Sequence, residues 1–146
     1  MNKIIIILSI LILSACSSKN ESYSILEAEK YIAINEYKSA QTICDKIIKS
    51  NELNNISATT LCRLSMAYMK LSEQSNENEN IAIATKCYQT ATKLYPDSAS
   101  LFFSELVIDD IQYAEMLRTL SDAIDAPQEI RDSEPTDSCC LTDTIL

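Results

Sequence analysis

The sequence contains neither histidine nor glycine among its 146 residues. Without histidine, it lacks the commonest acid–base group and metal ligand that works at neutral pH. Without glycine, a phosphate-binding P-loop and a dinucleotide-binding fingerprint are excluded, and tight hairpin turns lose their usual residue. Because Ala, Leu, Ile, Lys, Glu and Ser are plentiful, we expect an all-α fold and no cofactor.

Positive charge is also scarce, since 12 Lys and Arg stand against 21 Asp and Glu and give a net charge of −9. Such a surface repels the phosphate backbone of nucleic acids and the anionic headgroups of lipids. We therefore expect no nucleic-acid partner. Any contact with a membrane must come from a lipid and not from a basic patch.

The first fifteen residues form a leader in which Lys3 precedes an apolar run from Ile4 to Leu13. A run of about ten residues is too short to cross a bilayer as a helix, which needs ~20 residues. It fits the core of a signal peptide. An ordinary secretory signal is one interpretation of this leader, because Ser14 and Ala15 are the small residues that such a signal carries before its cleavage site.

The end of the leader, Leu13-Ser14-Ala15-Cys16, resembles the lipobox of bacterial lipoproteins. The resemblance implies a diacylglycerol on the Cys16 sulfur, cleavage before Cys16, and a lipid anchor in a membrane of the bacterial envelope. No Asp directly follows Cys16, which resembles the pattern that permits transfer to the outer membrane in Gram-negative bacteria. We expect residues 1–15 to be the signal peptide and residues 16–23 to be a flexible, lipidated tether.

About 130 residues remain after the leader, which suits one domain. Apolar periodicity predicts helices from Ser24 to a turn at Asn35-Glu36, from Tyr37 to Ile48, and from a cap at Ser57 to Leu71. Residues 72–80 have no apolar member and predict a solvated loop. The helical domain should span residues 24–125, followed by an acidic, disordered tail at residues 126–146.

Beyond that loop we expect a fourth helix from Ile81 to Leu94 that ends before Pro96. A fifth helix, capped by Asp97 or Ser98, should extend to Leu120. Asp109 and Asp110 interrupt its apolar pattern, where a kink is allowed. The apolar residues Leu101, Phe102 and Leu106 are expected to close the end of the helical array.

The third and fourth expected helices share a spacing of large, small and aromatic residues: Leu61, Leu64, Ser65 and Tyr68, then Ala84, Tyr88, Ala91 and Pro96. This series resembles the tetratricopeptide repeat, although Ser65 stands where Gly is usual and Leu61 where Trp is usual. About seven extra residues lie between Tyr68 and Ala84. The first two helices echo the series more weakly in Ala28, Tyr31, Ala40 and Cys44.

The resemblance implies an antiparallel array of helical hairpins, with about two repeats and a capping helix, in which small residues let the helices approach closely. A generic array of amphipathic hairpins is the alternative. In the family, the first helix of each repeat lines a concave surface. Exposed polar residues of the first and third helices are therefore candidates for partner binding, namely Lys30, Asn35, Arg63 and Lys70.

Five cysteines remain besides Cys16. We expect Cys44 and Cys62 to be small buried residues on neighbouring helices, where a disulfide between them is geometrically conceivable. Cys87 should be partly exposed. Cys139-Cys140 is spaced too closely for a structural zinc site, and we expect no metal centre.

Three carboxylates near the expected kink, Asp109, Asp110 and Glu115, are the strongest acid–base candidates. Adjacent residues of a helix point in different directions, so a solvated face is the better interpretation and we expect no enzyme. The sequence favours a non-catalytic, lipid-anchored protein-interaction module. The alternative is a structural component of an envelope assembly that self-associates through Phe102, Phe103 and Val107.

Overall fold

The computed structural model describes residues 17–126. These residues form six α-helices and a short 3₁₀ turn, with no β-strand among them. The helices are α2 (Ser17–Ala33), α3 (Tyr37–Ser50), α4 (Ala58–Ser72), α5 (Glu77–Leu94), α6 (Pro96–Ser104) and α7 (Ile108–Asp125), and the turn η1 spans Leu53–Asn55. The expectation of an all-α fold is confirmed.

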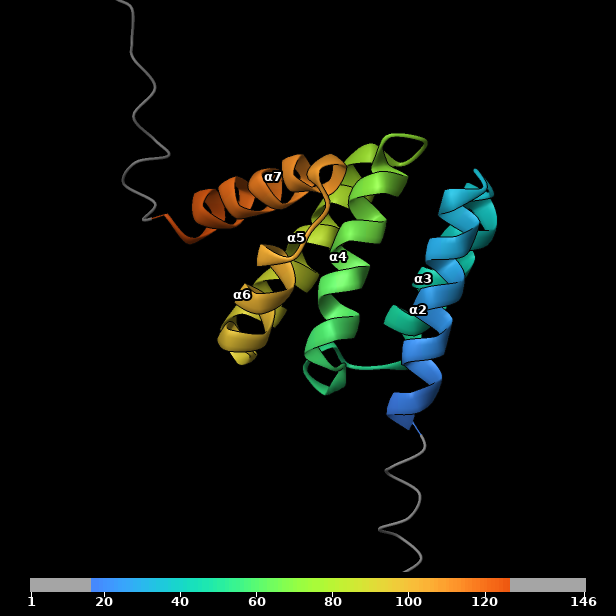
Figure 1. Cartoon of the computed structure of the whole chain (residues 1–146), viewed down its shortest axis with the longest axis horizontal. Coiled ribbons are helices and arrows are strands. Elements are labelled where there is room, and N and C mark those ends of the chain that lie inside the picture. Colours follow the sequence, from blue (N-terminus) through green and yellow to red (C-terminus); the bar gives the residue numbers. More distant parts are fainter. Residues whose placement is uncertain (1–16, 127–146) are drawn as a thin grey trace, which may run out of the picture.

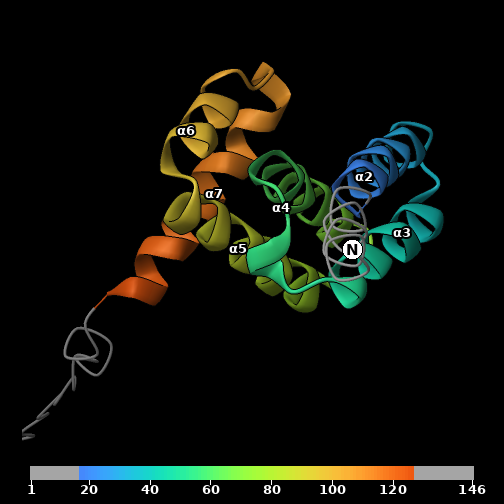
Figure 2. The ribbon, with the colours of Figure 1, turned by 90° about the horizontal axis from the view of Figure 1, so that it is seen from below.

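The helices pack side by side in an array (Figure 1). α2 pairs with α3 and α4 pairs with α5, while α4 also contacts α2 on one side and α6 on the other. α7 crosses against α5 and α4. Seen at right angles, α2 and α3 occupy one end of the array and α6 and α7 the other (Figure 2).

α4 is the central helix and forms most of the core. Its buried residues occupy both the face toward α5 and the face toward α2, and include Leu61, Leu64, Tyr68, Met69 and Leu71. Ile25 from α2, Ile47 from α3 and Leu117 from α7 complete the apolar interior. A single core therefore joins the ends of the array.

Asparagine replaces glycine where the backbone must turn with positive φ. Asn35 has φ 63° and Asn76 has φ 49°, the left-handed region that Asn tolerates better than most residues. After α2, the N–H of Glu36 donates to the carbonyl of Tyr31 and the N–H of Asn35 to that of Ile32. This is the Schellman arrangement that ends many helices, and it forms at the predicted turn.

Two other helix boundaries also agree with the sequence. The Oγ of Ser57 accepts a hydrogen bond from the backbone N–H of Thr60, so it caps α4 as predicted. α5 ends at Leu94, two residues before Pro96. The predicted cap at Asp97 or Ser98 is wrong, because Pro96 is itself the first residue of α6 and Tyr95 precedes it as the cap. Pro is well suited to that first position because it has no N–H to satisfy.

The tether predicted for residues 16–23 is wrong from Ser17 onward, since α2 already includes residues 17–23. The apolar pattern begins only later in the chain, but a polar first turn is still compatible with a helix whose later turns are packed. Glu21 is only 8% exposed, so this polar segment already packs against the rest of the domain.

The loop predicted at residues 72–80 is also shorter than expected, because α5 begins at Glu77. Asn80 is almost fully buried, and its side-chain amide donates a 2.8 Å hydrogen bond to the carbonyl of Ser75. Glu77 and Glu79 lie in the first turn, where negative charge is favourable. The extra residues relative to the repeat pattern therefore lengthen a helix as well as a loop.

The fifth helix is not continuous: α6 ends at Ser104 and α7 begins at Ile108. Val107 is extended and precedes α7, and Asp109 and Asp110 lie in its first turn. The two acids thus start a new helix, where its dipole favours them, rather than kink a single helix. Leu101 is 61% exposed, against the expectation for a capping residue, whereas Phe102 and Leu106 are half-buried against the core.

Candidate functional site

A groove runs across the helices that alternate along the array. Its lining comes from α2 and α4, from α6, and from the connection into α7: Glu29, Ile32, Arg63, Met66, Ala67, Lys70, Phe102, Glu105, Leu106, Val107 and Asp110. Its volume is about 340 Å³. Residues as far apart in sequence as 29 and 110 are brought together here, because α4 contacts α2, α6 and α7.

The groove has an apolar floor. Met66 and Ala67 are buried on α4, while Ile32 from α2 and Phe102 and Leu106 from the far side are half-buried. Val107 stands at the rim with 65% of its surface exposed. An apolar floor that stays open to solvent can bury side chains of a partner.

One wall of the groove is an ion pair that joins α2 to α4. Nη1 of Arg63 lies 2.5 Å from Oε2 of Glu29, and both side chains are about one-third exposed. Burial raises the pKa of the Glu29 carboxyl from its ordinary value of 4.5, although Arg63 and Lys70 pull it down in part. The carboxylate is therefore stabilised only by its cationic neighbours.

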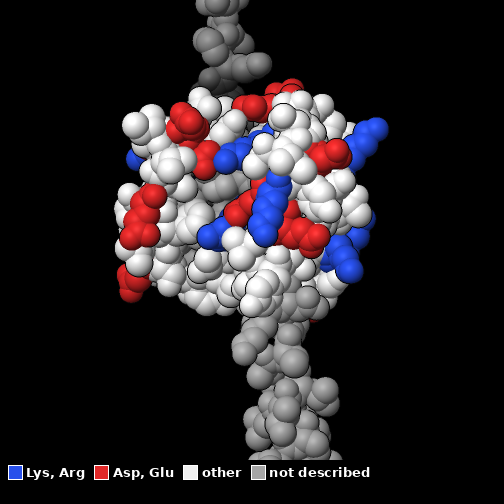
Figure 3. Space-filling view, turned by 45° about the vertical axis from the view of Figure 1, so that its right-hand side comes forward, with Lys and Arg blue, Asp and Glu red and all other residues white. Residues whose placement is uncertain are grey.

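A second ion pair joins α4 to α7 at the other wall. Nζ of Lys70 lies 2.7 Å from Oδ1 of Asp110, whose side chain is 18% exposed. Basic and acidic side chains stand side by side on the face of the molecule seen in Figure 3. The groove thus presents both signs of charge around an apolar centre.

Of the four polar residues predicted to face a partner, Arg63 and Lys70 line this groove. Lys30 and Asn35 do not. Lys30 lies on the outer side of α2 with Tyr23 and Leu26, and Asn35 lies in the α2–α3 turn, where its side chain accepts a 2.7 Å hydrogen bond from the hydroxyl of Tyr37. Glu29, Phe102 and Asp110 could not be found as groove residues from the sequence, because nothing local links them.

The residues quoted for the repeat resemblance lie mostly in the core. Those that are buried are Ala28, Ala40, Cys44, Leu61, Leu64, Ser65, Tyr68, Ala84 and Ala91. Tyr31 and Tyr88 are half-buried and Pro96 is exposed. The Tyr88 ring packs against Phe103 at 5.1 Å between centroids, and Phe103 in turn packs edge-on against Phe102 at 5.3 Å. The two phenylalanines are thus engaged within the chain.

A polar network stabilises the interface of α3 with α4. The buried Tyr68 hydroxyl donates to Oδ1 of Asp45 at 2.8 Å, and Nε2 of Gln41 donates to the same oxygen at 2.9 Å. Burial raises the pKa of Tyr68, and the bond to Asp45 raises it further. The phenol therefore remains a neutral donor rather than an acid–base group.

Three thiols are free and buried: Cys44, Cys62 and Cys87. No disulfide joins Cys44 to Cys62, and the expectation of a partly exposed Cys87 is wrong. Burial raises the pKa to about 12 for Cys44, about 11 for Cys62 and about 12 for Cys87. Thiols with such pKa values are poor nucleophiles near neutral pH. Cys139 and Cys140 lie outside the described residues.

The acid–base candidates near the start of α7 do not face one another across a cavity. Asp110 is paired with Lys70, and Glu115 with Arg118 on the exposed side of α7 at 2.6 Å. Within residues 17–126, no cluster of His, Cys, Asp and Glu could hold a metal ion. Asp110 and Glu115 are therefore engaged in ion pairs.

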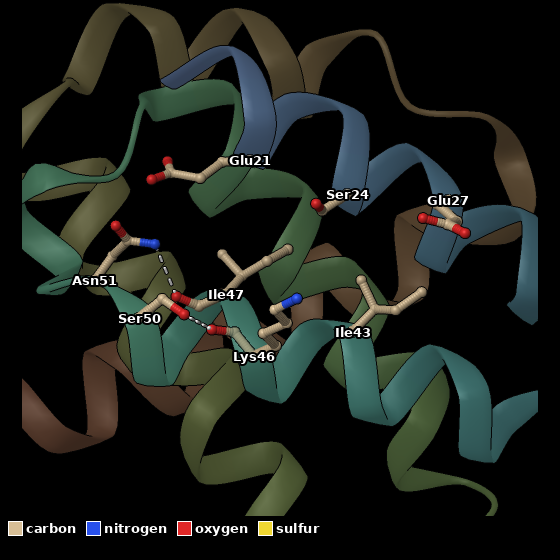
Figure 4. Close-up of a pocket in the computed structure, with 8 residues that line it drawn as sticks. All are labelled: Glu21, Ser24, Glu27, Ile43, Lys46, Ile47, Ser50 and Asn51. Atoms are coloured by element: carbon tan, nitrogen blue, oxygen red, sulfur yellow. Dashed lines mark hydrogen bonds between the residues drawn. The ribbon is translucent and has the colours of Figure 1, made fainter. Parts of the chain in front are cut away.

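A second, more polar groove lies between α2 and α3 (Figure 4). Its lining includes Glu21, Glu27, Ile43 and Lys46. The last turn of α3 closes one end, where Ser50 and Asn51 donate their side-chain hydrogen bonds to the carbonyls of Lys46 and Ile47. It involves a single hairpin, whereas the groove across α2, α4 and α6 also includes Asp110 of α7.

No protein-family model, curated protein or solved structure matches this chain. Among the described helices, none is both long and apolar enough to span a membrane. The leader, Cys16 and the acidic tail from residue 127 lie outside the described residues.

Proposed function

We propose that this chain is a lipid-anchored lipoprotein of the bacterial envelope that acts as a non-catalytic protein-interaction module. The resemblance of Leu13-Ser14-Ala15-Cys16 to a lipobox supports the anchor. The observation that carries the binding role is the groove formed by α2, α4 and α6 together. In Gram-negative cells the expected location is the outer membrane.

The packing order supports a tetratricopeptide-like array. α2 and α3 form one hairpin, α4 and α5 the next, and α6 packs on both members of the second hairpin. In this arrangement α2, α4 and α6 correspond to the first helices of successive units, those that line the concave surface in the family. The small buried residues Ala28, Ser65 and Ala84 are consistent with that close packing.

The partner is a protein or peptide that presents apolar side chains flanked by charges of both signs. Met66, Phe102 and Leu106 accept the apolar part. A partner carboxylate can approach Arg63 or Lys70, and a partner cation can approach Glu29 or Glu105. Mixed charge at the rim favours orientation and specificity more than affinity.

The anchor and the groove are tested in one experiment on the acylated protein in membranes. Wild type and Cys16→Ser are compared by intact mass, membrane fractionation and affinity capture after mild crosslinking. We expect acylation and membrane association only with Cys16, and a defined partner with the wild type. Absence of the lipid mass from the wild type contradicts the anchor.

A matched pair of rim substitutions tests the groove. Val107→Asp places a charge at the groove rim, whereas Ile108→Asp changes the next residue, which is 86% exposed and does not line the groove. Capture of the partner should fall by at least about tenfold for Val107→Asp, equivalent to ~1.4 kcal/mol, and stay unchanged for Ile108→Asp. Equal effects of the two contradict a groove-specific contact.

A second candidate is a structural component that self-associates, because apolar surface is exposed on α6, on α7 and between them, at Leu101, Val107, Ile108 and Ile111. Sedimentation of the Cys16→Ser protein distinguishes the two roles. A monomer favours capture of a partner in the groove. A stable dimer that is lost in Ile108→Asp favours self-association.

A further inference from the structure

The outer face of α2 is apolar and has no partner within the described part of the chain. Tyr23 is 75% exposed, Leu26 41% and Ile34 64%. The opposite side of the same helix buries Ile25 and Ala28 in the core. α2 lies at the edge of the array, where only α3 and α4 pack extensively against it (Figures 1 and 2).

These residues form one continuous stripe. At about 100° per residue, positions 23, 26, 30 and 34 fall within roughly 80° around the helix axis. Ile34 follows the last residue of α2 but keeps the helical register, because its N–H donates to the carbonyl of Lys30. Tyr31 borders the stripe and is half-buried. The stripe extends along the helix from Tyr23 to Ile34.

The charge of this face differs from that of the whole chain. Loss of Lys3 with the leader changes the net charge from −9 to −10, yet the outer face of α2 carries one acid, Glu27, and one base, Lys30. The two charges cancel. A neutral, apolar face that contains tyrosine is suited to the boundary between lipid headgroups and acyl chains.

The distance from Cys16 to this face is short. α2 begins at Ser17, so no flexible tether separates its first turn from the proposed lipid. At about 1.5 Å per residue, Tyr23 lies roughly 9 Å and Ile34 roughly 26 Å along the helix from Ser17, the residue that follows Cys16 in the sequence. A helix that lies flat on the bilayer brings all of these residues to the interface, whereas one that stands upright brings only its first turns.

We propose that the outer face of α2 lies in the headgroup region of the membrane that holds the Cys16 lipid. The inference rests on the proposed acylation of Cys16. The lipid supplies most of the affinity, and α2 supplies the orientation. α6 and α7 then project away from the bilayer, and the groove across α2, α4 and α6 opens sideways above it.

The chain contains no tryptophan, so a single introduced indole reports its own environment. We would place Trp at the stripe in Leu26→Trp and in Ile34→Trp, each in the full-length acylated protein reconstituted in phosphatidylcholine vesicles. Ile108→Trp is the control, because position 108 is the first residue of α7, lies outside the α2 stripe and is 86% exposed. Emission wavelength and quenching by brominated phospholipids are measured.

Indoles at positions 26 and 34 should show blue-shifted emission and be quenched by lipids brominated about 5–10 Å below the headgroups, the depth of interfacial helices. The indole at position 108 should not be quenched. High salt should leave the result unchanged, because the face is neutral.

Three outcomes contradict the proposal. If the acylated protein floats with the vesicles but positions 26 and 34 behave like position 108, the anchor stands and the α2 contact is wrong. If mass analysis finds no lipid on Cys16 and the protein does not float, the anchor and the α2 contact both fail. If the blue shift occurs without vesicles and grows with protein concentration, the face binds a second copy of the chain instead.

Discussion

The hydroxyl of Tyr68 on α4 donates a 2.8 Å hydrogen bond to Oδ1 of Asp45 on α3. The bond connects the second hairpin to the first, and Gln41 donates to the same carboxylate oxygen. Because Tyr68 is fully buried, its hydroxyl has no water to replace the partner. Tyr68 is therefore both packed in the core and hydrogen-bonded across the two hairpins.

Removal of that hydroxyl should weaken the contact of the two hairpins. Tyr68→Phe is expected to lower the free energy of unfolding by about 1.5–3 kcal/mol, the usual contribution of a hydrogen bond to a charged group. Urea denaturation of the Cys16→Ser form measures it. Tyr23→Phe is the control, since Tyr23 is 75% exposed, and an equal loss in both variants contradicts the role of the bond.

Close packing of α4 on α5 depends on a small residue at position 84. Ala84 is fully buried, so Ala84→Leu should destabilise the fold by about 1–3 kcal/mol through overpacking. Ala82 lies on the exposed side of the same helix, and Ala82→Leu should change stability little. Thermal unfolding of the two variants tests the prediction. If the larger loss occurs at position 82, the assignment of the packed face is wrong.

The start of α4 should be more sensitive than the start of α6 to the loss of a serine. Ser57→Ala removes the observed cap and should lower the free energy of unfolding by about 0.5–2 kcal/mol. Ser98→Ala removes a residue that the sequence pattern suggested as a cap but that the structure places inside α6. Ser98→Ala should leave the free energy of unfolding nearly unchanged. Denaturant midpoints compare the two, and similar losses contradict the observed boundaries.

The groove carboxyl of Glu29 should make stability depend on pH in a particular direction. Burial raises its folded-state pKa above the ordinary value of 4.5, so the folded protein binds the proton more tightly than the unfolded chain does. The stabilisation from that proton is complete below pH 4.5 and is lost as pH rises through the folded-state pKa.

Glu29→Gln removes this titration. Its stability profile should therefore be flatter than that of the wild type in the window just above pH 4.5. Denaturant unfolding at several pH values measures the difference. In Arg63→Gln the free energy of unfolding should depend on pH more steeply than in the wild type, because Arg63 lowers the pKa of Glu29. A wild-type stability that rises with pH through this window, and does so less in Glu29→Gln, contradicts the assignment.

Much of the helical core could be predicted from residue spacing. Apolar and small residues at helical intervals placed Ala28, Leu64, Tyr68 and Ala84 on packed faces, and all four are buried. Local chemistry also located the Ser57 cap and the end of α5 before Pro96. These features depend on contacts within a few residues, which a sequence displays directly.

The polar ends of the helices could not be predicted, because tertiary contacts decide them. Residues 17–23 and 77–80 have no apolar periodicity, yet they are helical. Asn80 is buried, and its side-chain amide donates a hydrogen bond to the carbonyl of Ser75. The groove was missed for the same reason. Its ion pairs join Glu29 to Arg63 and Lys70 to Asp110, and no local pattern connects either pair.

The measurement that tests the proposed function most directly is photocrosslinking in intact cells, with the crosslinking residue placed at Val107 on the groove rim. Lys49, exposed on α3 and away from the groove, serves as the matched control. A groove that captures a partner at the membrane predicts a discrete adduct from position 107, which is absent from position 49 and lost with Cys16→Ser. The same adducts from both positions, or an adduct that persists without Cys16, would contradict an anchored interaction module.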